Sequence, residues 1–167
     1  MIKSKKELKE FIEQDRIANS RKTSIPKVFG DEIWKFLISL RKGEYYFGLS
    51  KWKKIIYSPL IALNKIKFHN LSVKLGFSIP LNVFDKGLCI PHYGTIVVSH
   101  GARVGKNAKL HEGVNIGATN GETEAATIGD NVFIGTGVKI IGKITIDRCG
   151  TESHDLLYLL DRFSLLI

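Results

Sequence analysis

The chain of 167 residues is long enough for one compact unit with an appended segment, and its 44% hydrophobic share excludes disorder throughout. The net charge of +9 lies in the first half: residues 1–86 hold 18 Lys and Arg against 8 Asp and Glu, whereas residues 87–167 hold 7 against 8. Because no recognition motif accompanies this charge, nucleic-acid binding is not expected. Two cysteines give neither a disulfide framework nor metal-ligand spacing, and no apolar run has the length of a membrane span, so we expect a cytoplasmic protein without a metal.

Residues 1–75 are predicted to form an α-helical N-terminal region. Ser4 and Glu7 make a capping-box pattern ahead of the first helix. After a break that contains Pro and Gly, Asp31 is expected to cap a second helix. A third helical stretch contains Pro59, which is expected to bend or end it.

The third helical stretch mixes lysines with aromatic and aliphatic residues. This composition suits an anionic membrane surface, but such a stripe more often packs against its own protein. Association with a membrane surface is therefore an alternative that the sequence does not favour. The lysines are Lys51, Lys53, Lys54, Lys65 and Lys67.

Beyond the helical region, aliphatic residues recur every six positions, or every twelve where a loop intervenes, and each has another apolar residue two positions earlier. A period of six indicates a coil of short parallel strands in which three hexapeptides make one triangular turn, with the aliphatic residues inside. Glycines, Asn107 and Asn131 are expected to relieve the backbone at the corners. The repeat positions are Ala102, Val104, Ala108, Leu110, Val114, Ile116, Ala126, Ile128, Val132, Ile134, Val138, Ile140, Ile144 and Ile146.

The repeat is displaced by two residues near its start. Phe84, Ile90 and Ile96 are six apart, but Val98 restarts the count two positions later. A displacement in a regular coil marks a place where the wall exposes a functional side chain to its surroundings. His92 lies in this segment.

Three runs resemble the serine O-acetyltransferase family of hexapeptide-repeat acyltransferases, most closely the branch found with capsule and exopolysaccharide synthesis. They are GFSIP at 76–80, GLCIPHYGTIVV at 87–98 and VNIGAT at 114–119. The resemblance covers about residues 30–146 and is tightest over 76–146. It implies a mainly β fold, a left-handed parallel β-helix preceded by the helical region. It also implies a homotrimer with active sites between neighbouring prisms and acetyl-CoA as the co-substrate.

His92 matches the general base of that family. A hydroxyl is a poor nucleophile until its proton is being removed, and a neutral imidazole takes that proton near pH 7. The same imidazole then returns the proton to the leaving CoA sulfur. Backbone N–H groups at the coil corners are suited to hold the oxyanion.

The chain departs from the family where free serine is held. The resemblance places an Asp before the catalytic His, where this chain has Pro91, and an orienting Asp at the position of Phe77. The loop 118–127 lacks the Arg-His pair that the family places near the amino-acid carboxylate. These departures favour another small-molecule or glycan hydroxyl acceptor in polysaccharide biosynthesis. Serine acetylation in cysteine biosynthesis is the alternative.

Other side chains near His92 are candidates for the site. His111 is a candidate second catalytic group, with a solvated histidine on the coil wall as the alternative. Tyr93, which precedes it by one coil of eighteen residues, is expected to stack nearby. Tyr93, Thr119 and Asn120 are the predicted acceptor-binding residues. A Cys–His nucleophile that uses Cys89 is the less favoured alternative, because the family attacks directly without an acyl-enzyme.

The resemblance also indicates where acetyl-CoA binds. Motif alignment places contacts with corner backbone groups at Gly117, Ala118, Gly135 and Thr136. Lys139 and Lys143, on later coils, are predicted to meet the CoA phosphates.

The hexapeptide register ends after Ile146. Residues 147–167 form an atypical tail in which Ser153 or Asp155 is expected to cap a short apolar helix that covers the open end of the coil. Later coils of the family help to bind CoA. A truncated, inactive β-helix that serves as an assembly or binding module is therefore a further alternative.

Overall fold

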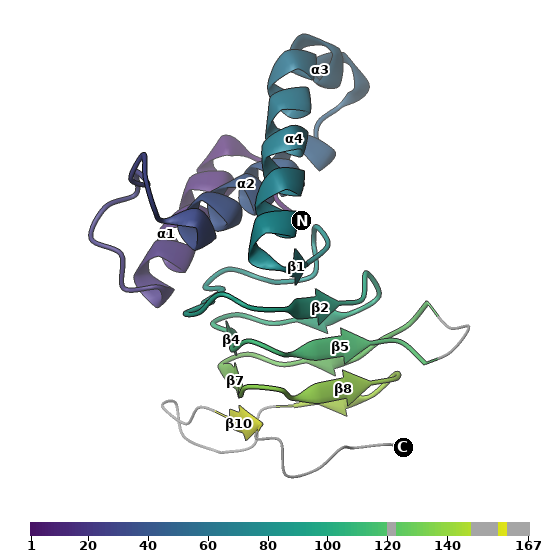
Figure 1. The fold of residues 1–167 in the computed structure, drawn as a ribbon. Coiled ribbons are helices and arrows are strands. Elements are labelled where there is room, and N and C mark those ends of the chain that lie inside the picture. The colour runs from purple at the N-terminus through teal and green to yellow at the C-terminus, as the bar shows by residue number, and fades with distance from the viewer. Residues whose placement is uncertain (120–122, 148–156, 160–167) are drawn as a thin grey trace.

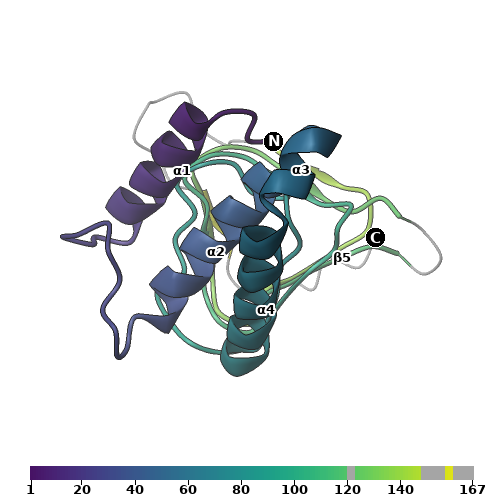
Figure 2. The ribbon, with the colours of Figure 1, turned by 90° about the horizontal axis from the view of Figure 1, so that it is seen from above.

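The computed structural model describes residues 1–119, 123–147 and 157–159. Four helices precede a coil of short strands, and the helices lie across one end of that coil (Figure 1). Viewed along its axis, the coil has a triangular outline (Figure 2). The helices are α1 (Lys5–Ala18), α2 (Glu32–Phe47), α3 (Lys51–Ile56) and α4 (Ser58–Leu75).

The helix boundaries follow the predicted signals in part. The Ser4 hydroxyl accepts the Glu7 backbone N–H at 3.1 Å, which confirms the cap of α1. The chain breaks between α3 and α4 just ahead of Pro59, which occupies the first turn of α4 where its missing N–H costs nothing. The predicted cap of α2 is wrong. Asp31 has a positive φ of 58° and makes no cap bond, because its carboxylate accepts the Arg21 guanidinium and the Lys27 backbone N–H instead.

Three fully parallel sheets form the three faces of the coil. The first has the order β1-β2-β5-β8, the second β3-β6-β9 and the third β4-β7-β10, so that from β2 onward successive strands lie on successive faces. The strands are β1 (Phe77–Ser78), β2 (Ile96–Val98), β3 (Arg103–Val104), β4 (Lys109–Leu110), β5 (Asn115–Gly117), β6 (Thr127–Ile128), β7 (Val132–Ile134), β8 (Lys139–Ile141), β9 (Thr145–Ile146) and β10 (Leu157–Leu159).

The hexapeptide positions fill the interior, as the sequence predicted. All of them up to Ile140 are buried, while Ile144 and Ile146, at the far end of the coil, are partly buried. Each coil therefore covers the apolar face of its neighbours. At one corner Asn107 and Asn131 both have a φ of +57°, and the side-chain amide of Asn107 donates to Asn131 at 2.9 Å. The predicted corner role of these asparagines is confirmed.

The strand register confirms the two-residue displacement. Cys89 lies opposite Lys109, an offset of twenty, whereas Val97 lies opposite Asn115, an offset of eighteen. The first coil therefore carries two more residues than the second between these points. His92 is within that enlarged corner.

A buried ionic cluster joins the helices to the first coil. Arg41 on α2 donates to Asp15 of α1 at 2.7 Å and to Glu44 at 2.9 Å, and all three side chains are almost fully buried. Asp15 also accepts the backbone N–H groups of Gly87 and Leu88, each at 2.8 Å. Burial alone would lower the pKa of Arg41, but the charges of Asp15 and Glu44 outweigh it and raise the pKa. The cluster holds the helical region on the coil in one orientation.

The atypical tail is described only in part. Leu157–Leu159 forms β10, which pairs in parallel with β7 and continues the third face. These three residues are therefore a strand and not the helix expected from their apolar composition, since the edge of β7 offers backbone partners. Ser153 and Asp155, the expected caps, lie outside the described residues.

Candidate functional site

The turns that join the third face to the first stack into one corner of the coil, here called the His92 corner. It comprises residues 90–95, 111–114 and 135–138. Backbone bonds hold its turns together: Gly113 N–H donates to Thr95 O at 2.7 Å, and Gly137 N–H donates to Glu112 O at 3.0 Å. Side chains from three successive coils are therefore fixed one above another.

Two imidazoles meet in the His92 corner. His92 is exposed, as expected of a residue in the enlarged turn. Its ring lies edge-on to that of His111, with centroids 5.4 Å apart and an interplanar angle of 65°. Beneath His111 lies Phe133 of β7, with ring centroids 4.8 Å apart. The prediction that His111 lies beside His92 is confirmed.

Glu112 completes this cluster. The Thr136 hydroxyl donates to Glu112 Oε1 at 3.0 Å, and Glu112 Oε2 lies 3.9 Å from His111 Nδ1. The absence of a side chain on Gly94 leaves room for Glu112, since a Cβ on Gly94 would come within 2.7 Å of the Glu112 Cβ. Among the described residues, His111 Nε2 and Glu112 Oε2 are enclosed and make no hydrogen bond. Because neither atom has exposed surface, a bound group could contact them only after a rearrangement of the corner.

The charges of the cluster suit proton transfer. Burial lowers the pKa of His111 below its ordinary 6.5, with Lys109 and His92 acting in the same direction and Glu112 opposing them. The pKa of Glu112 is lowered by its own backbone N–H and by the Thr136 hydroxyl. His111 is thus neutral and Glu112 ionised near pH 7. A neutral imidazole and a carboxylate therefore lie beside His92.

The structure opposes both the predicted stacking of Tyr93 and the less favoured alternative of a Cys89 nucleophile. Tyr93 does not stack on His111: its hydroxyl lies 3.5 Å from Glu32 Oε2, at the start of α2, because the enlarged turn carries its ring toward the helices. Burial raises the pKa of the Cys89 thiol, which opposes the thiolate that a Cys–His nucleophile needs.

The predicted coenzyme residues divide between two corners. Gly135 and Thr136 belong to the His92 corner, and the Lys139 ammonium donates to Gly113 O at 2.6 Å in the same corner. Gly117 and Ala118 instead end β5 at the next corner, where the long loop leaves the coil.

This second corner is here called the loop corner, residues 117–119, 123–125 and 142–143. Gly142 N–H donates to Gly117 O at 3.0 Å, and Ala118 forms a bridge with Ala125. Lys143 pairs with Glu124 at 2.6 Å, so a carboxylate competes with phosphate for this lysine. Thr119 is exposed there, and Asn120 lies outside the described residues.

Glu112 and Phe133 were not identified from the sequence. A signal for Glu112 was present, because it follows Gly94 by eighteen residues and precedes Thr136 by twenty-four, the separations that the register gives to stacked positions. Among the described residues, no group of three or more His, Cys, Asp or Glu side chains is arranged to hold a metal ion. No helix of the described chain is long and apolar enough to cross a membrane.

Comparison with known proteins relates the chain to serine acetyltransferases. It is 30% identical over 154 residues to the serine acetyltransferase of Staphylococcus xylosus, with 88% of this chain and 66% of the relative covered. It is 28% identical over 144 residues to that of Staphylococcus aureus strain Mu50, with 84% and 62% covered. The chain thus spans just under two thirds of the length of these relatives. No protein-family model matches it.

The fold is that of solved serine acetyltransferases. The enzyme from Brucella abortus strain S19 superposes with a TM-score of 0.61 over 84% of this chain and 57% of that one, at 18% identity. The order of helices followed by a three-faced parallel coil is therefore shared.

Proposed function

We propose that this chain is a member of the serine acetyltransferase-like acyltransferases and transfers an acetyl group from acetyl-CoA to a hydroxyl. The observation that carries the proposal is the 30% identity to a serine acetyltransferase, because an alignment over 88% of the chain must include the central His92 corner. With that relationship we infer a left-handed coil, the hand of this acyltransferase fold. Membership of the capsule and exopolysaccharide branch is proposed on the sequence runs at 76–80, 87–98 and 114–119 alone.

In the proposed reaction His92 is the general base. Its neutral imidazole accepts the proton of the acceptor hydroxyl while that oxygen attacks the thioester carbonyl. The tetrahedral intermediate collapses as the C–S bond breaks, and the imidazolium returns the proton to the CoA sulfur. An acetyl ester and free CoA result. The exposed position of His92 lets both substrates reach it.

His111 and Glu112 are proposed to position His92 in place of the orienting carboxylate of the family. Phe77 cannot provide that carboxylate, since it is buried and packs edge-on against Phe36 with ring centroids 5.2 Å apart. The edge-on contact with His111 restricts the orientation of the His92 ring instead.

The two-corner distribution of the coenzyme residues supports a site between neighbouring copies. In the proposed trimer of parallel coils, the His92 corner of one copy faces another copy, whose loop corner supplies Gly117, Ala118 and Thr119. Asn120, outside the described residues, remains a proposed acceptor contact. Acetyl-CoA would then contact Gly135 and Thr136 on one side and Gly117 and Ala118 on the other. Lys139 and Lys143 remain the candidate phosphate contacts.

The relatives make L-serine the first acceptor to test. Free CoA thiol released from acetyl-CoA is measured with L-serine present and absent, and formation of O-acetylserine is followed by mass spectrometry. Serine-dependent release identifies a serine acetyltransferase. Calorimetry that shows no binding of acetyl-CoA would instead support an inactive assembly module.

Two features of the sequence favour a second acceptor, a hydroxyl of a glycan precursor. Pro91 occupies the position of the family Asp that helps to hold the amino acid, and the loop 118–127 contains neither Arg nor His. Without these groups the ammonium and carboxylate of serine lack their expected partners. Acetyl-CoA turnover with sugar acceptors but not with serine would establish this alternative.

A further inference from the structure

The helical hairpin formed by α3 and α4 exposes large apolar side chains. Trp52 is 80% exposed and Ile56 is 75% exposed. The sequence favoured packing of this stripe against its own protein, but only one face of α4 does so. The exposed set is here called the hairpin surface: Trp52, Ile55, Ile56, Leu60, Leu63 and Ile66, with Lys51, Lys53, Lys54, Lys65 and Lys67 among them.

The inner face of α4 already has its partner. Phe68 stacks on Phe36 of α2 with ring centroids 5.2 Å apart, and the Asn64 amide donates to Ser39 O at 3.0 Å. Leu60, Leu63 and Lys67 border a pocket that α2 also lines, but every apolar side chain of the hairpin surface is at least half exposed, so much of its apolar area does not hold α4 in place. A helix that is apolar on both faces normally has a second partner.

The charge of this hairpin has a single sign. No Asp or Glu occurs between Glu44 and Asp85, whereas six lysines lie in that interval. Of these six, within the part of the chain that the structure describes, only Lys74 pairs with a carboxylate, that of Glu32. The remaining lysines have no carboxylate partner and are available to anionic groups outside the chain.

An apolar groove opens beside the hairpin surface. Its volume is about 690 Å³, and Phe47, Ile61, Phe68 and Leu81 contribute to its walls. Lys54 and Lys65 also line it. A ligand with an acyl chain and an anionic head group matches this juxtaposition of an apolar groove and free ammonium groups.

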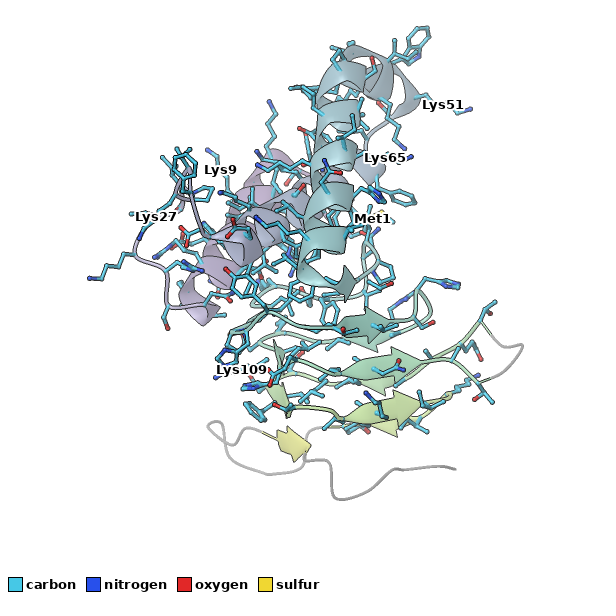
Figure 3. The ribbon with its side chains drawn as sticks, in the orientation of Figure 1. Met1, Lys9, Lys27, Lys51, Lys65 and Lys109 are labelled. Carbon is cyan, nitrogen blue, oxygen red and sulfur yellow. The ribbon has the colours of Figure 1, made fainter. Side chains whose placement is uncertain are left out.

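We propose that α3 and the outer face of α4 bind the surface of an anionic membrane. The apolar side chains enter the boundary between head groups and acyl chains, and the lysines contact anionic phospholipid head groups. A second copy of this chain fits less well, since a symmetric contact would bring lysines against lysines with no carboxylates to pair them. Lys51 and Lys65 lie toward the end of the hairpin that is remote from the coil (Figure 3), so a membrane can approach without covering the coil.

Vesicle binding tests this proposal independently of acetyl transfer. The full chain is mixed with vesicles of phosphatidylcholine alone or of phosphatidylcholine with phosphatidylglycerol, and binding is measured by flotation and by tryptophan fluorescence. Trp52 reports entry through a blue shift, whereas Trp34 is 1% exposed and stays constant. Binding and a blue shift are expected only with the anionic vesicles.

Two variants and a matched control sharpen the test. Lys51→Gln with Lys65→Gln should lower the partition coefficient by on the order of tenfold or more, because each lysine near an anionic surface contributes appreciably. Ile55→Gln with Ile56→Gln should abolish the blue shift of Trp52. Lys9→Gln with Lys27→Gln removes the same charge on the side of α1 (Figure 3) and should preserve binding to within about twofold.

Three results would overturn the proposal: no binding to anionic vesicles, equal binding to neutral ones, or equal losses in the lysine variant and its control. A fourth contradicting result can come from sedimentation without vesicles. If the Ile55→Gln, Ile56→Gln variant forms a smaller assembly than the parent chain, the hairpin surface is a contact between copies instead. Circular dichroism of each variant verifies that α3 and α4 remain folded.

Discussion

The His92 ring lies edge-on to the His111 ring with centroids 5.4 Å apart, although nineteen positions separate the two residues in the sequence. The enlarged first corner produces this pairing. In a regular coil of eighteen residues, the position above His111 would be Tyr93. The two extra residues instead place the imidazole of His92 over His111 and direct Tyr93 toward α2.

Replacement of His111 tests its positioning role. In His111→Gln the ring contact with His92 is lost while a neutral polar group is kept, so kcat for acetyl transfer should fall on the order of ten- to a hundredfold. Because His111 is proposed to act through His92, KM for acetyl-CoA should change little. An unchanged kcat would remove His111 from the site.

Stability toward acid should depend on His111. Its pKa in the folded chain is below 6.5, mainly because burial disfavours the charged form, so the unfolded chain binds more protons around and below that pH. Stability present above pH 6.5 is therefore lost as the pH falls through the folded-state pKa. Urea unfolding at several pH values should show a smaller loss between pH 7 and 5 for His111→Gln than for the parent chain, and identical profiles would contradict this assignment.

The coil was predictable from the sequence because the period of the sequence repeat equals the number of residues in one strand and one corner. Each hexapeptide contributes one strand and one corner, so the period of six and the displacement near His92 translate directly into the observed register. The ends of the coil were less predictable. Leu157–Leu159 lacks a hexapeptide signal. It pairs with β7 through backbone groups, and the residue types in this segment do not predict that pairing.

The ionic cluster was missed because its partners are distant in the sequence. Asp15 and Arg41 are twenty-six residues apart, and neither belongs to a motif. A signal existed: Asp15 follows Leu8 by seven positions and Phe11 by four, so it lies on the apolar stripe of α1. A charged residue on such a stripe requires a buried partner, but one sequence does not indicate which residue that is.

Removal of Arg41 should be strongly destabilising. Arg41→Met leaves the carboxylates of Asp15 and Glu44 buried without their cation, which costs about 3–5 kcal/mol of unfolding free energy. Denaturant unfolding of the parent and the variant measures this difference. Arg16→Gln, which breaks a partly exposed pair with Glu13 and a hydrogen bond to Arg21 O, is the control and should have a much smaller effect. Equal effects would show that the cluster is not a major source of stability.

Gly94 should be required for the shape of the His92 corner. Its φ of +136° disfavours any other residue, and a Cβ would lie 2.7 Å from the Glu112 Cβ. Gly94→Ala should therefore displace Glu112 and lower both stability and acetyl transfer. Gly30→Ala is the control, since Gly30 also has a positive φ of +76° but no atom within 4 Å of the added Cβ. It should cost only backbone strain, about 1–2 kcal/mol, and leave turnover unchanged. Equal turnover in the two variants would contradict the proposed arrangement.

The proposed role of His92 is tested most directly by CoA release in His92→Ala, measured with acetyl-CoA and the acceptor that the parent chain uses. His69→Ala, which removes an exposed imidazole on α4, away from both corners of the coil, is the matched control. The loss of a general base should lower kcat by about a hundredfold or more, while His69→Ala retains parental turnover and both variants still bind acetyl-CoA. Parental turnover in His92→Ala would contradict the account.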